Sequence, residues 1–211
     1  MIRYVATLLF AFSAVALGDG ISKVNGSIRV DDGQRTGDVS TVNGSITVGR
    51  DAQVGDVDTV NGSVRLGPGA TAEAADTVNG DVVLDERVQV KGSVDTVNGE
   101  MTLRTGASVG GSLENVNGEI MLQGAQVAGR IETVNGDVFV GAGSRVDGGI
   151  HVEKNEGWFK RKPSRNPKVT IESGAVVAGP LHFEREVDLY VGSGATIGPV
   201  EGVPPKRYPL P

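Results

Sequence analysis

The sequence predicts an all-β fold, a single-stranded parallel β-helix (β-solenoid) of about nine triangular coils with 18–19 residues in each coil. The first observation is the tripeptide Val-Asn-Gly, which recurs at successive spacings of 18, 18, 18, 19, 19 and 18 residues. The second is a composition with 32 glycines, only 4% aromatic residues and many Val, Ile and Ala, which favours strands over a conventional globular core. The third is an apolar alternation of period two between glycines, which is typical of short strands joined by turns. Asn-Gly also marks antiparallel hairpins, but hairpins give no reason for so regular a period.

The first 18 residues, MIRYVATLLFAFSAVALG, predict a secretory signal peptide. Arg3 precedes an apolar run, and small residues at its end allow cleavage after Ala16 or Gly18. An uncleaved membrane anchor is the alternative, but the run is short for a bilayer span. We therefore expect an exported protein, periplasmic or on the cell surface, with no transmembrane helix after cleavage.

The charge and the missing cysteines exclude several classes of function. Without Arg3 the chain keeps 19 of its 20 basic residues against 26 acidic ones, so a nucleic-acid partner is not expected. The chain has no cysteine, which excludes disulfide bonds, thiolate metal sites and a cysteine nucleophile.

Residues 19–203 form the predicted solenoid domain, and the Asn-Gly pairs form its sharpest corners because both residue types tolerate positive φ. Coils in a parallel β-helix lie about 4.8 Å apart, so the corner amides are predicted to hydrogen-bond as a buried ladder along the axis. The predicted ladder consists of Asn25, Asn43, Asn61, Asn79, Asn98, Asn117 and Asn135. A second ladder is predicted from Thr41, Thr59, Thr77, Thr96 and Thr133.

Two columns of mostly acidic residues flank the corners. Three residues before the Asn stand Ser40, Asp58, Asp76, Asp95, Glu114 and Glu132; two residues after it stand Ser45, Ser63, Asp81, Glu100, Glu119 and Asp137. One interpretation is a ridge that collects Ca²⁺, because hard cations prefer oxygen ligands. The other is a solvated edge that keeps the solenoid soluble and limits lateral aggregation.

A basic excursion at residues 154–168 interrupts the repeat and contains the only Trp of the chain. It follows an outward column that is polar early and apolar late: Arg29, Thr47, Arg65, Val83, Thr102, Met121 and Phe139. The excursion either folds back over Met121 and Phe139 or presents an exposed patch to a partner or an anionic envelope polymer. The candidate patch consists of Trp158, Phe159, Lys160, Arg161, Lys162 and Arg165.

The last residues, 204–211, are predicted to be a Pro-rich tail. The segment VPPKRYPLP has four prolines in nine residues, so we expect it to stay out of the hydrogen-bonded ladder and to cover the last coil.

Candidate catalytic groups are few. His151 and His182 are the only two histidines, and each is interpreted as a surface or strand residue. Left-handed β-helix acyltransferases share the coil length and use a catalytic His, but three His ligands for a metal site are absent, as are a nucleophile elbow and a phosphate-binding loop. We therefore expect no catalytic residue, cofactor or metal ion, with a β-helix enzyme acting on carbohydrate or acyl substrates as an alternative.

Two groups of bacterial β-solenoids resemble parts of this sequence. The units GASVGGSL, GAQVAGRI and GSRVDGGI resemble bactofilins, the polymer-forming cytoskeletal proteins, and the units TVNGDV and TVNGSI resemble a family of adhesin-type domains with short repeats. Either resemblance covers most of residues 24–200, and the resemblance to bactofilins implies a right-handed triangular β-helix. It also implies a non-catalytic structural or adhesive protein of the bacterial cell envelope, or a filament-forming scaffold that self-associates. The export signal departs from the cytoplasmic or inner-membrane location of a typical bactofilin.

Overall fold

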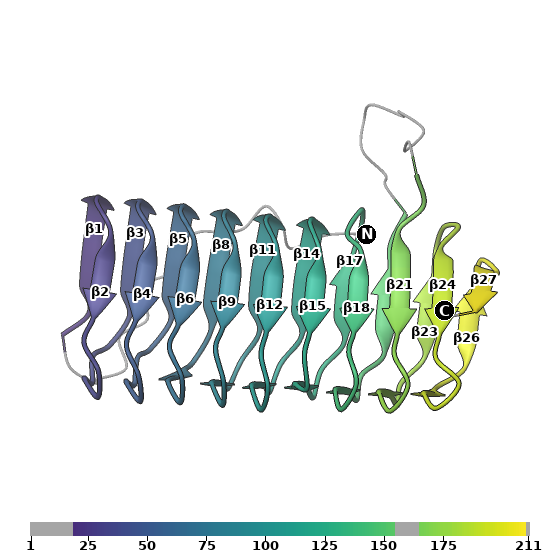
Figure 1. Ribbon diagram of the computed structural model, residues 1–211. Coiled ribbons are helices and arrows are strands. Elements are labelled where there is room, and N and C mark those ends of the chain that lie inside the picture. Colours follow the sequence, from purple (N-terminus) through teal and green to yellow (C-terminus); the bar gives the residue numbers. More distant parts are fainter. Residues whose placement is uncertain (1–18, 155–164, 210–211) are drawn as a thin grey trace.

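The computed structural model describes residues 19–154 and 165–209, which form a parallel β-solenoid with three sheets (Figure 1). Two sheets have ten strands and the third has seven, and every strand pair is parallel. Ten stacked strands enclose nine full turns, so the predicted fold class and number of coils are confirmed.

Each coil contributes one strand to each ten-stranded sheet, and most coils contribute one to the third sheet. Sheet A consists of β1 (Ile21–Asn25), β3 (Val39–Asn43), β5 (Val57–Asn61), β8 (Ala75–Asn79), β11 (Val94–Asn98), β14 (Leu113–Asn117), β17 (Ile131–Thr133), β20 (Ile150–Val152), β23 (Leu181–Phe183) and β26 (Val200–Gly202). Sheet B consists of β2 (Ile28–Val30), β4 (Ile46–Val48), β6 (Val64–Leu66), β9 (Val82–Leu84), β12 (Met101–Leu103), β15 (Ile120–Leu122), β18 (Val138–Val140), β21 (Lys168–Ile171), β24 (Asp188–Val191) and β27 (Lys206–Pro209). Sheet C consists of β7 (Thr71–Ala72), β10 (Gln89–Val90), β13 (Ser108–Val109), β16 (Gln126–Val127), β19 (Arg145–Val146), β22 (Val176–Val177) and β25 (Thr196–Ile197).

The register keeps each repeat position in one column through the stack. In sheet A, Val39 lies opposite Val57, Val57 opposite Ala75 and Ala75 opposite Val94. These residues point inward and are fully buried, while the residue that follows each of them points outward. The period-two alternation of the sequence therefore fills a narrow core with Val, Ile, Leu and Ala from all three sheets.

The corner glycines are needed for a reason other than the predicted one. Among the seven Val-Asn-Gly corners, only Gly26 and Gly118 have a φ in the left-handed region. At Gly80, a Cβ atom would lie 2.1 Å from the carbonyl oxygen of Gly62 in the preceding coil, and the other stacked corners are equally tight. The prediction based on positive φ is therefore wrong for most corners, because glycine is required by the close approach of stacked backbones.

The proline-rich tail joins the ladder, contrary to the sequence-based expectation. Residues Lys206–Pro209 form β27, which pairs with β24. The N–H of Lys206 donates to the carbonyl oxygen of Val187 at 2.9 Å, so backbone groups of alternate residues from Lys206 face β24. Pro209 is out of phase with Lys206 and lies in the last strand of sheet B, where a missing N–H removes no ladder bond.

Candidate functional site

The corner asparagines form a continuous hydrogen-bonded ladder. In each step the Nδ2 group of one Asn donates to the Oδ1 atom of the Asn in the preceding coil, at 2.9–3.1 Å from Asn43 through Asn135. The side chains are exposed, apart from half-buried Asn135, so the expectation of a buried ladder is wrong. The row is thus a stripe of amides in contact with solvent.

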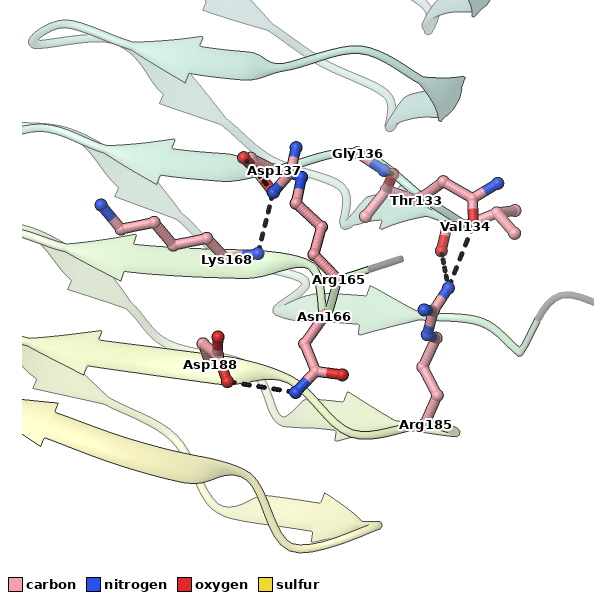
Figure 2. A network of polar contacts seen from close by, with 10 residues as sticks. Thr133, Val134, Gly136, Asp137, Arg165, Asn166, Lys168, Arg185 and Asp188 are labelled. Atoms are coloured by element: carbon pink, nitrogen blue, oxygen red, sulfur yellow. Dashed lines mark hydrogen bonds and ion pairs between the residues drawn. The ribbon is translucent and has the colours of Figure 1, made fainter. Parts of the chain in front are cut away.

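The ladder ends at a guanidinium group. Arg185 donates from the same nitrogen to the Oδ1 atom of Asn135 and to the carbonyl oxygen of Val134, both at 3.0 Å (Figure 2). The N–H of Gly136 is bonded differently from those of the earlier corners. At the first five corners, from Gly26 to Gly99, the glycine N–H donates to the Asn carbonyl of the next coil, whereas Gly136 donates to the hydroxyl oxygen of Thr133 at 2.9 Å. The side chains of Thr133 and Arg185 therefore replace the contacts between coils at this corner.

The threonine column stacks as expected but does not form a side-chain ladder. Thr59 donates its hydroxyl hydrogen to the carbonyl oxygen of Gly44, and Thr77 donates to that of Gly62, both at 2.9 Å. Asn115 occupies the same position and donates its amide to Gly99 at 2.9 Å. These buried side chains connect neighbouring coils through the corner carbonyl groups and do not bond to one another.

Four carboxyl groups of the first acidic column, those of Asp58, Asp76, Asp95 and Glu114, have raised pKa values. Burial, followed by repulsion from neighbouring carboxylates, raises the pKa of Asp58 to about 6, that of Asp76 to about 8 and that of Asp95 to about 7. One carboxyl oxygen of Asp76 and one of Asp95 are buried without a hydrogen-bond partner. The middle of this column is therefore partly protonated near neutral pH, which weakens the case for a strong Ca²⁺ site there.

The second acidic column accepts hydrogen bonds from the backbone of the next coil. The side-chain oxygen of Ser63 accepts the N–H of Asp81 at 3.2 Å, and Asp81 accepts the N–H of Glu100 at 2.9 Å. Asp137 continues this pattern by accepting the N–H of Lys168 at 2.9 Å (Figure 2). Several of these side chains are thus part of the stacking machinery, a role that neither sequence interpretation included.

Most of the predicted basic patch lies outside the described residues. This applies to Trp158, Phe159, Lys160, Arg161 and Lys162. Arg165, the described member, donates to both carboxylate oxygens of Asp137 at 2.7 and 2.8 Å (Figure 2). Met121 and Phe139 are half-buried neighbours in β15 and β18. The two interpretations of the excursion stay predictions.

An ion-paired cluster on sheet B was not predicted from the sequence. Asp85 is buried and accepts two hydrogen bonds from Arg65, at 2.9 and 3.0 Å, and its other partner is Arg104 at 3.3 Å. Asp85 stands where two earlier coils have Gly49 and Gly67. Because the two arginines are about half exposed, the cluster contributes modestly to stability.

Two histidines, His151 and His182, and two glutamates, Glu153 and Glu184, lie in neighbouring coils on the outer face of sheet A. His151 and His182 are opposite each other in β20 and β23, and their ring centroids are 5.1 Å apart. Glu184 lies 3.4 Å from His151, between its Oε1 and the imidazole Nε2. The sequence interpretation treated the histidines separately and missed this cluster.

Comparisons with known proteins add no classification of this chain beyond its fold. No protein-family model, curated protein or solved structure matches this chain. The parallel β-solenoid therefore stands on the strand pairing alone, without support for a bactofilin-like or adhesin-type relationship. Within residues 19–154 and 165–209, no helix is long and apolar enough to cross a membrane.

Proposed function

We propose that this chain is an exported, non-catalytic β-solenoid with a structural or adhesive role in the bacterial cell envelope. The observation that carries this proposal is the Asn ladder, which repeats one exposed amide per coil from Asn25 to Asn117 on a rigid stacked scaffold. A row of identical groups at strand spacing, about 4.8 Å, suits a repetitive partner such as an envelope polymer better than a single small substrate.

The regularity of the outer surface supports a non-catalytic role. An active site brings different groups together at one place, usually a nucleophile, a base and a group that stabilises developing charge. From β3 to β14 the corner position of sheet A instead repeats an amide, and the outward position three residues before it repeats a hydroxyl or a carboxylate. Such rows present many equivalent weak contacts, and their combined effect is avidity.

The positive charge of the basic excursion indicates that the proposed partner is anionic. Residues 154–168 carry six basic side chains against one acidic side chain, whereas the complete chain has a net charge of −6. A local reversal of sign orients a protein toward an anionic surface and increases the rate of encounter. We therefore favour an anionic envelope polymer as the partner.

Co-sedimentation of the purified protein with isolated cell envelopes tests this proposal. We expect retention in low salt that falls on substitution of Lys160, Arg161 and Lys162 by Ser, without a change in melting temperature. The matched control replaces Lys23, Arg29 and Arg35, three exposed basic residues of the first coil, by Ser. Equal retention of the two variants, or no retention of the parent, would contradict the proposal.

Filament formation is the second candidate, and the open ends of the solenoid favour it. Strands β1 and β2 have a neighbour on one side only within the described chain, and Val24 in β1 is 67% exposed. Unpaired edges of this kind are templates for pairing with another chain. Analytical ultracentrifugation distinguishes the candidates, since a filament predicts concentration-dependent polymers that a Val24→Lys substitution disperses. A monomer at all concentrations would exclude this candidate.

A further inference from the structure

The tripeptide His-X-Glu occurs at two places on sheet A. The copies are His151-Val152-Glu153 and His182-Phe183-Glu184, and they contain both histidines of the chain. Residues two apart on a strand point to the same face of the sheet. Because Val152 and Phe183 are fully buried, the His and Glu of each copy lie together on the outer face.

The two copies occupy neighbouring coils although they are 31 residues apart in the sequence. Strand β20 pairs with β23 so that His151 lies opposite His182 and Val152 lies opposite Phe183. The N–H of Glu184 donates to the carbonyl oxygen of Val152, which extends the same register by one residue. The excursion between the copies hides this relationship in the sequence, while the fold produces a two-by-two arrangement of imidazoles and carboxylates.

The ligand atoms of this region form two groups of three that share His151. One atom from each of His151, His182 and Glu184 lies within 4.8 Å of the others, and the same holds for Glu132, His151 and Glu153. The side chains of His151 and Glu184 are 21% and 29% exposed, so they are partly shielded while still accessible to an ion. Tetrahedral ligands at Zn²⁺ distances are about 3.3 Å apart, which small side-chain rotations can reach.

The surrounding contacts leave suitable atoms for coordination. The N–H of Lys154 lies 3.3 Å from Oε2 of Glu184, so that oxygen is occupied while Oε1 faces His151. Nδ1 of His182 lies 3.8 Å from a carboxylate oxygen of Glu201, a placement that can orient the ring with Nε2 available. Glu132 pairs with Arg130 at 3.1 Å, which makes Glu153 the better fourth ligand.

We propose that His151, His182, Glu184 and Glu153 bind one divalent first-row transition ion of the Zn²⁺ type. Two imidazole nitrogens with carboxylate oxygens suit Zn²⁺, Cu²⁺ or Ni²⁺, whereas Ca²⁺ and Mg²⁺ prefer oxygen ligands alone. Four protein ligands form a closed, structural site. The ligands come from sequence segments before and after the excursion, so the ion links two neighbouring coils.

Calorimetric titration of the purified full chain, without a histidine tag, with ZnCl₂ tests this site. We expect one Zn²⁺ per chain, with affinity at least tenfold weaker in His151→Ala, His182→Gln and Glu184→Gln variants. The matched control is Glu100→Gln, which removes an exposed carboxylate from the second acidic column. Circular dichroism checks that each variant is folded. Because the chain has two histidines, NMR of the parent gives a readout that needs no variant. Both imidazoles should shift with Zn²⁺ and neither should shift with Ca²⁺.

Three results would overturn the proposal. The first is no Zn²⁺ binding at millimolar concentration by the folded parent. The second is undiminished binding by a His151→Ala, His182→Gln double variant, which would place the ion on the acidic columns. The third is an NMR titration in which Zn²⁺ leaves both imidazole signals unchanged.

Discussion

Arg185 donates a hydrogen bond to the side-chain oxygen of Asn135 at 3.0 Å, and this contact ends the asparagine ladder two coils before Arg185 itself. Within the described residues the ladder has no further Asn after Asn135, since β20 ends at Val152 and the described chain resumes at Arg165. The long guanidinium side chain of Arg185 also donates to the carbonyl oxygen of Val134. The asparagine ladder is thus capped by Arg185, which is not a member of the ladder.

Replacing Arg185 by Ala should destabilise the protein by about 1–2 kcal/mol, because two acceptors lose a charged donor. Thermal or urea unfolding measures the effect. Arg145→Ala is the matched control, since Arg145 pairs with Asp147 and both side chains are about half exposed. The control should change stability by less than about 0.5 kcal/mol. An equal loss in the two variants would show that Arg185 does not cap the ladder.

The corner positions should differ in their tolerance of substitution. Asn79→Ala removes two exposed hydrogen bonds, to Asn61 and from Asn98, and should lower the unfolding free energy by about 1 kcal/mol. Gly80→Ala should lower it by about 3 kcal/mol or more, because the added Cβ would lie 2.1 Å from a backbone oxygen that cannot move freely. Urea unfolding of both variants measures the difference. A larger loss in the Asn79 variant would contradict the close-approach explanation.

Stability should fall as the pH rises through the range in which the first acidic column titrates. The pKa of Asp76 is raised from 3.8 to about 8, chiefly by burial and next by Asp95, so the folded state binds more protons than the unfolded state between these values. The unfolding free energy therefore decreases from about pH 4 to about pH 8. Melting temperatures at pH 5 and pH 8.5 test this sign.

The variant that isolates this effect is Asp76→Asn with Asp95→Asn, which mimics the protonated column. Its melting temperature should depend less on pH than that of the parent, while Glu100→Gln should keep the parent's dependence. A parent that melts at a higher temperature at pH 8.5 than at pH 5 would contradict the buried, protonated column.

The fold could be predicted because each repeat encodes the same local geometry. The spacing of Val-Asn-Gly predicted one coil per repeat, and the alternation around Ile46 and Val48 predicted which side chains enter the core. The conformation of the corners was harder to predict. The sequence shows a glycine at position 80 but does not show the backbone of the preceding coil, which is what requires it.

Features that depend on contacts between distant coils escaped the sequence. The prolines near Lys206 indicated a tail outside the sheet, yet a terminal strand needs only every second N–H. The two His-X-Glu copies are separated by the excursion, so their pairing across β20 and β23 appears only when the coils are stacked. Arg185, which caps the ladder, is 50 residues away in the sequence from its partner Asn135.

The location and amino terminus of the native protein test the central claim, export to the cell envelope, most directly. Cell fractionation followed by mass spectrometry of the intact protein should find it in the periplasmic or surface fraction, shortened at a site close to residue 18. This result follows from Arg3, the apolar run after it and the small residues before Asp19. A cytoplasmic protein that begins with an intact Met1 would contradict the account.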